Sequence, residues 1–177
     1  MALFSCGQKG AGETAAPVPE VKKASATAAP SFDADSAYAY VEKQVAFGYR
    51  VPNTPGHKAC GDYLASELKR FGAQVYEQEA TLKAYDGTPL EARNIIGSFN
   101  PDKDKRILLF AHWDTRPYSD HDPDPANHKK PLDGADDGAS GVGALLEIAR
   151  QMGMKAPEVG EDILFFEARE YGQLEYA

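Results

Sequence analysis

Residues 106–114 read RILLFAHWD, and this stretch decides the fold class. Ile107 to Ala111 form a continuous apolar run, which is typical of a β-strand covered on both faces. The run ends abruptly at His112 and Asp114. A second apolar run, Asp162 to Phe166, ends in the same way, at the charged segment 167–170. Two buried strands that are each followed directly by charged or polar residues predict a central sheet with polar groups at its edge.

The residues between these strands predict a helix. In GADDGASGVGALLEIARQMG, residues 134–153, one helical face carries Val142, Leu145, Leu146, Ala149 and Met152. Helices that alternate with buried strands predict an α/β fold. We expect three layers around a central mixed, mostly parallel sheet, and such sheets bind ligands at the carboxyl ends of their strands.

Four further elements are predicted upstream. A helix follows Phe32, with Asp35 or Ser36 as its cap, and ends at Gly48. A second helix begins with Thr54 as N-cap and Pro55 at the first position, and ends at Gly72. Two strands, 74–85 and 90–99, are joined by a turn at residues 86–87.

Two side chains of the second helix need an interpretation. Cys60 shares a face with three apolar residues, so we expect it to be a core residue and not a nucleophile. The partners on this face are Leu64, Leu68 and Phe71. His57 lies in the first turn, where we expect a surface side chain.

Composition limits the function classes. The chain has 177 residues, of which 42% are hydrophobic, and this suits one folded domain with some unstructured length. A net charge of −8 argues against a nucleic-acid partner. Two cysteines, Cys6 and Cys60, are too few for a disulfide framework.

The N-terminal segment, residues 1–31, differs in character from the rest. Leu3-Phe4-Ser5-Cys6 resembles the end of a bacterial lipoprotein signal, without the basic start and long apolar core of such a signal. Residues 7–31 are rich in Ala, Pro, Gly and Lys, which predicts a flexible tether. We expect a periplasmic or membrane-anchored bacterial lipoprotein, with Cys6 as the lipidated residue, followed by a folded domain over residues 32–177. Any contact with a membrane would be made through this anchor.

Three polar segments can converge at the edge of the sheet. His112 and Asp114 follow one strand, Glu167 to Glu170 follow the other, and Asp136 and Asp137 precede a helix. Each segment alone is weak evidence, because an acid before a helix is usually an N-cap. Together, carboxylates and an imidazole are the ligands that a zinc ion accepts in tetrahedral geometry.

The chain resembles the M28 family of zinc peptidases, and within it the bacterial glutaminyl-peptide cyclotransferases. Three motifs in order carry the resemblance: AHWDTRP at 111–117, DGADDGASGVGALLEIAR at 133–150 and ILFFEAREYG at 163–172. YRVPNTPGH at 49–57 and YSDHDPDPANHKKP at 118–131 are similar to the cyclotransferase branch. The resemblance implies a zinc-exopeptidase-like fold, bound Zn²⁺, and conversion of a peptide's N-terminal glutamine to pyroglutamate with release of ammonia.

The resemblance also implies roles for individual residues. Asp137 and Glu170 fall on two zinc-ligand positions, and the third ligand, a histidine, is expected beyond residue 177. Arg169 falls on the position of the catalytic glutamate. Arginine accepts no proton, so it cannot serve as that base. A cation at this position would also disfavour a bound metal by charge repulsion.

The remaining polar residues have weaker assignments. His112 and Asp114 support the site, or are simply a hydrogen-bonded strand end. Asp136 is expected to be a solvated neighbour of Asp137, and Trp113 to line the substrate pocket or to pack beneath it. His121 and His128 lie in a long acidic loop that we expect to border the pocket, without a ligand role.

Two alternatives remain open at this stage. One is a two-metal aminopeptidase of the same family, and the other is a non-catalytic fragment. Because the family fold continues past residue 177, we expect the fold to be incomplete at its C-terminus and to expose apolar sheet surface. We therefore expect this chain by itself to be inactive or nearly so.

Overall fold

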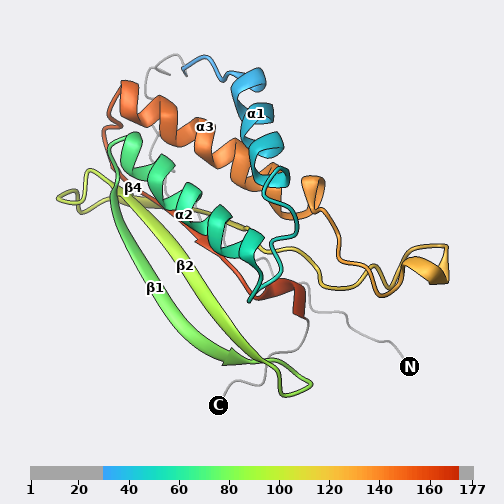
Figure 1. Ribbon diagram of the computed structural model, residues 1–177. Helices are drawn as coiled ribbons and strands as arrows, with labels where there is room; N and C mark the ends of the chain where they lie inside the picture. The colour runs from blue at the N-terminus through green and yellow to red at the C-terminus, as the bar shows by residue number, and fades with distance from the viewer. Residues whose placement is uncertain (1–29, 172–177) are drawn as a thin grey trace, which may run out of the picture.

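The computed structural model describes residues 30–171, and Cys6 and its tether lie outside this range. Within it, three α-helices lie on one side of a four-stranded sheet, where α2 and α3 pack against the strands and α1 packs against α3 (Figure 1). The helices are α1 (Ala34–Val45), α2 (Pro55–Arg70) and α3 (Gly141–Met154). The strands are β1 (Gln74–Lys83), β2 (Pro89–Phe99), β3 (Arg106–His112) and β4 (Gly160–Phe166). None of the helices in this range is long and apolar enough to cross a membrane.

The sheet is mixed, as expected, with the strand order β1-β2-β4-β3, but among the described strands it is not mostly parallel, because two of its three pairings are antiparallel. Of the pairings among the described strands, only β3–β4 is parallel, and it aligns His112 with Phe166. The β1–β2 and β2–β4 pairings are antiparallel. The parallel pair is the one that matters for the site, because it brings the carboxyl ends of both charge-terminated strands to the same edge.

The helix caps follow the sequence closely. Thr54 caps α2 by accepting a hydrogen bond from the backbone N–H of His57, and Pro55 occupies the first helical position, as predicted. The cap of α1 is Asp33, two or three residues earlier than expected, because its carboxylate accepts from the N–H of Ser36.

The core lies between the helices and one face of the sheet. Cys60, Leu64 and Leu68 of α2 are fully buried there, so the prediction that Cys60 is a core residue is confirmed. Burial also raises the pKa of the Cys60 thiol to about 12. The apolar face of α3 packs against Ile163 and Phe165 of β4.

The opposite face of the sheet is open within residues 30–171. Leu108 is 55% exposed and Phe110 is 63% exposed, so the prediction that β3 is covered on both faces is wrong for the described chain. The reason is that α1, α2 and α3 all lie on the other side. The expectation of exposed apolar sheet surface is confirmed.

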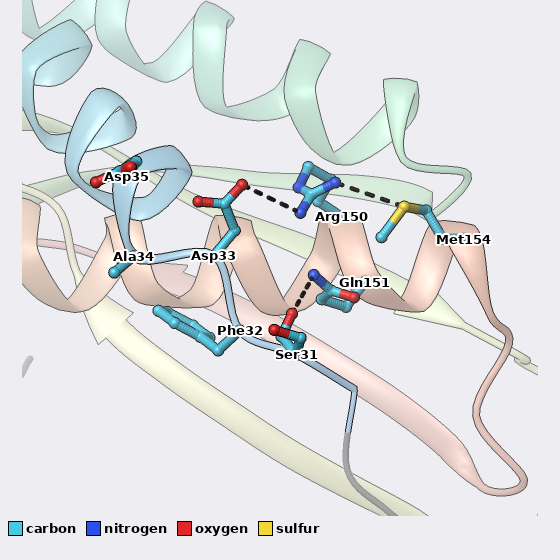
Figure 2. Close-up of a pocket in the computed structure, with 8 residues that line it drawn as sticks. All are labelled: Ser31, Phe32, Asp33, Ala34, Asp35, Arg150, Gln151 and Met154. Atoms are coloured by element: carbon cyan, nitrogen blue, oxygen red, sulfur yellow. Dashed lines mark hydrogen bonds and ion pairs between the residues drawn. The ribbon is translucent and has the colours of Figure 1, made fainter.

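The start of the described chain is fastened to α3. Glu147 is completely buried, and its carboxylate accepts hydrogen bonds from the backbone N–H of Asp33 and from Arg150 and Gln151. Figure 2 shows the shallow pocket beside this anchor, where Gln151 also donates to the carbonyl of Ser31 (3.0 Å). These contacts are structural, and they place α1 against α3.

Candidate metal centre

His112 is held at the end of β3 by Asp114. The Asp114 carboxylate is fully buried, with Oδ1 3.3 Å from Nδ1 of His112, and it accepts from the backbone N–H of Glu170 (3.2 Å). A carboxylate behind an imidazole fixes the orientation of the ring. Burial alone would lower the pKa of His112, but the hydrogen bonds to Asp114 and Asp137 outweigh it and raise that pKa.

Asp137 lies in a kinked helical turn, η2 (Ala135–Ser140), that leads into α3. The kink places Gly138 at φ +107°, a conformation that glycine adopts without strain. A Cβ on Gly138 would lie 3.0 Å from the carbonyl oxygen of Asp114 and 3.4 Å from the His112 ring. The glycine therefore lets the turn approach the end of β3 closely, and Asp137 reaches His112.

Arg50 joins the segments that carry these groups, a role that sequence reasoning missed, since its only signal was its place in the 49–57 motif. Its side chain is fully buried, and it donates to the carbonyls of Trp113 (3.2 Å), Asp133 (2.9 Å) and Gly134 (2.7 Å). Burial lowers the pKa of Arg50, but an arginine stays protonated in a protein. One buried cation thus connects the end of β3 to the turn that carries Asp137.

Glu170 and Arg169 follow β4 through a sharp change of direction. Ala168 has φ +67° and is fully buried, a left-handed conformation that is unfavourable for a residue with a Cβ. This turn starts the short helix η3 (Arg169–Tyr171) and directs Glu170 back towards Asp114.

Three side chains from these segments converge on one point. The ligand atoms of His112, Asp137 and Glu170 all lie within 4.8 Å of one another. The expected proximity of Asp137 and Glu170 is therefore confirmed. His112, expected only in a supporting place, is part of the same group, with Nε2 2.9 Å from Oδ1 of Asp137. Two carboxylates and an imidazole are a suitable donor set for zinc.

Arg169 lies among these donors. Its Nη1 is 2.7 Å from Oδ1 of Asp137, 2.6 Å from Oε1 of Glu170 and 3.0 Å from Nε2 of His112. For Asp137, burial would raise the pKa, but the bonds to His112 and Arg169 outweigh it and lower that pKa. As arranged here, the donor set suits a metal, but the guanidinium stands among the donors.

The interpretation of His57 as a surface residue is wrong. His57 is only 6% exposed, stacks on the fully buried Trp113 with ring centroids 4.4 Å apart, and bonds the carboxylate of Glu167. Burial raises the pKa of Glu167. His57 is buried because it contacts Trp113 and Glu167, which follow β3 and β4, whereas Pro55 and Lys58 of the same turn are exposed. Trp113 accordingly packs beneath the site and also contributes to a pocket with His57 and Arg93.

The other polar residues lie at the margin. Asp136 is exposed, as expected of a solvated neighbour. His121 is exposed in the long loop, and the His128 ring bonds the carbonyl of Asp122 (2.8 Å). Neither histidine joins the group around Asp137.

Comparisons with known proteins agree with this arrangement. Residues 94–175 match the model of peptidase family M28. The chain is 75% identical to a Zn-dependent exopeptidase from Parabacteroides distasonis, with a TM-score of 0.81 over 85% of this chain and 51% of that one. It is 66% identical to a glutaminyl cyclase from Tannerella forsythia, with a TM-score of 0.80 over 82% of this chain and 50% of that one.

A curated relative is more distant. The alkaline phosphatase isozyme conversion protein of Escherichia coli is 25% identical over 139 residues, which are 72% of this chain and 40% of that protein. The chain thus spans about half the length of the solved structures that it resembles, and less of this curated relative.

Proposed function

Because residues 94–175 match the model of peptidase family M28, we propose that this chain belongs to that family and that its site is that of a zinc-dependent glutaminyl-peptide cyclotransferase. The observation that carries the proposal is the convergence of His112, Asp137 and Glu170 at the edge of the sheet. Identity of 66% to a solved glutaminyl cyclase supports this substrate class. The substrate would be a peptide or protein with an N-terminal glutamine.

The reaction closes a five-membered ring within the substrate. The α-amino nitrogen attacks the carbon of the side-chain amide, a C–N bond forms, and the original amide C–N bond breaks. The proton lost by the attacking amine leaves with the departing ammonia. Zinc, when bound by Asp137 and Glu170 with an imidazole, supplies a Lewis acid for the amide oxygen.

The residues of this chain position part of the site for that reaction. Asp114 orients His112 and holds the backbone of Glu170, so one buried carboxylate positions two members of the group. Arg50 keeps Asp137 beside them. The proton transfer has no carboxylate at position 169, because Arg169 can only donate hydrogen bonds. We therefore propose that the chain as it stands turns over slowly or not at all.

A chimera tests this function. Residues 1–171 would be joined to the corresponding C-terminal half of the Tannerella forsythia glutaminyl cyclase, with Arg169 kept or changed to Glu. We expect ammonia release from a Gln-initiated peptide to rise by about 10²–10⁴-fold in the Arg169→Glu chimera, the usual contribution of general acid–base catalysis. A Leu-initiated peptide is the control for aminopeptidase activity.

Two results would contradict these proposals. Rapid ammonia release by the unmodified 177-residue chain would support the cyclotransferase function but contradict the proposed loss of activity through Arg169. Cleavage of the Leu-initiated peptide by the Arg169→Glu chimera, without cyclisation of glutamine, would identify an aminopeptidase.

We also propose that Cys6 is lipidated and anchors the protein to a bacterial membrane. The support is the segment Leu3-Phe4-Ser5-Cys6 and the tether-like composition after it. When the protein is expressed in bacteria behind a complete signal sequence, a clickable palmitate analogue should label it, and Cys6→Ala should remove the label. Equal labelling of the variant would refute the anchor.

A further inference from the structure

We infer that the guanidinium of Arg169 is the resident cation of this site and competes with a divalent metal for the same donors. This inference rests on the proposed zinc site, but it concerns metal binding and not turnover. It goes beyond the loss of a catalytic base, because it assigns a positive role to the residue that replaced the base.

The first argument is geometric. A single nitrogen, Nη1, lies 2.6–3.0 Å from one ligand atom of each of Glu170, Asp137 and His112. The two distances to carboxylate oxygens are those of strong charge-assisted hydrogen bonds. Zinc binds such atoms at about 2.0–2.2 Å. A metal bound by the same three atoms would lie within van der Waals distance of Nη1, so the two cations exclude each other.

The second argument is electrostatic. Asp137 and Glu170 bring two negative charges to one point, and Asp114 lies directly behind them. Without a cation, their mutual repulsion would push the segments apart. Arg169 bridges both carboxylates, one at the end of β4 and one before α3, and so holds the site closed in the absence of a metal.

The third argument concerns access. Half of the Arg169 side chain is exposed to solvent, and Asp137 is 60% exposed. The guanidinium can therefore swing away from the site without breaking the core. The guanidinium therefore lowers the affinity of the site for a metal ion but does not block the site permanently. A metal that enters must displace Arg169 and then tolerate its charge nearby.

Zinc titration of the whole chain tests the competition. We expect Arg169→Gln, which keeps the approximate size and removes the charge, to bind one Zn²⁺ about 10- to 100-fold more tightly than the wild type, as measured by competition with a chromophoric chelator. The matched control is Arg116→Gln, because Arg116 is a partly exposed arginine whose ion pair with Asp120 lies outside the group. The control should bind zinc as the wild type does.

Thermal unfolding adds an independent readout. Without metal, Arg169→Gln should melt below the wild type, and zinc should raise its melting temperature more than that of the wild type. Adding Asp137→Asn to Arg169→Gln should abolish the gained affinity if the metal binds here.

The outcomes separate the two proposals. Zinc binding by the wild type as tight as by Arg169→Gln would overturn the competition and leave the zinc site standing. Gained affinity that survives Asp137→Asn would also overturn it. Failure of Arg169→Gln to bind zinc at all would overturn the proposed metal site, and the competition with it.

Discussion

Replacing Arg50 by methionine is expected to unfold the candidate site before it unfolds the rest of the domain. The methionine side chain is apolar and unbranched but shorter than arginine, so it fills part of the same buried volume. It removes the three donors that now reach the carbonyls of Trp113, Asp133 and Gly134. The protein then keeps these acceptors without their partner.

The size of the effect follows from burial. Arg50 is fully buried, and its bond to the carbonyl of Trp113 is buried too, so water does not replace that donor, whereas the bonds to Asp133 and Gly134 are only part-buried. A hydrogen bond from a charged group contributes about 1.5–3 kcal/mol, and such values are not additive within one group. Because the groups left behind are neutral carbonyls and not an unpaired charge, we expect the free energy of unfolding to fall by about 1.5–3 kcal/mol in total. Arg50→Lys should recover less than half, because an ammonium cannot span the three carbonyls.

Two assays report this change. Trp113 is the single tryptophan of the chain, and its carbonyl is one of the acceptors, so urea unfolding can be followed by its fluorescence. Trypsin cleavage after the exposed Lys129 should accelerate, because Arg50 fastens the end of the loop at residues 133–134. The control, Arg116→Met, removes an exposed ion pair and should cost about 0–1 kcal/mol. If Arg50→Met lies within about 1 kcal/mol of the wild type and the loop is cleaved no faster, the reasoning about this buried cation is wrong.

Three further predictions concern other parts of the fold. Burial would raise the pKa of Glu147, but its hydrogen bonds to Arg150 and Gln151 outweigh burial and lower that pKa, so the stabilisation by Glu147 is present above pH 4.5 and is lost as the pH falls below that value. The variant Glu147→Gln should therefore lose less stability than the wild type as the pH falls. An unchanged decrease of stability at acid pH would contradict this prediction. Cys60, with its pKa raised to about 12 by burial, should resist iodoacetamide at pH 8 in the native protein and react on unfolding, as mass spectrometry of the peptide can show. Phe110→Gln should reduce aggregation measured by light scattering, because Phe110 is 63% exposed on the open sheet face, whereas no change would indicate that this face does not mediate association.

The sequence by itself determined the local elements and the polar ends of the strands. Thr54 and Pro55 began a helix, the apolar stripe of residues 142–152 formed another, and the 86–87 turn joined two antiparallel strands. It also predicted that the segments after β3 and β4, with His112 and Glu170, converge, because the carboxyl ends of these parallel strands share an edge of the sheet, and that Asp137, before α3, joins them. These features depend on neighbours in the chain or on a general rule of sheet topology, so a pattern of residues can reveal them.

The tertiary structure decided the contacts between distant segments. The link from Arg50 to Gly134, the burial of His57 on Trp113, and the open face beside Phe110 each depend on which segments pack together. Arg169 shows the difference most clearly, since its charge and its place beside Glu170 were evident in the sequence but its contacts with His112 and Asp137 were not. The physical reason is that periodicity fixes the face on which a side chain lies, whereas its partners are fixed only when the chain closes on itself.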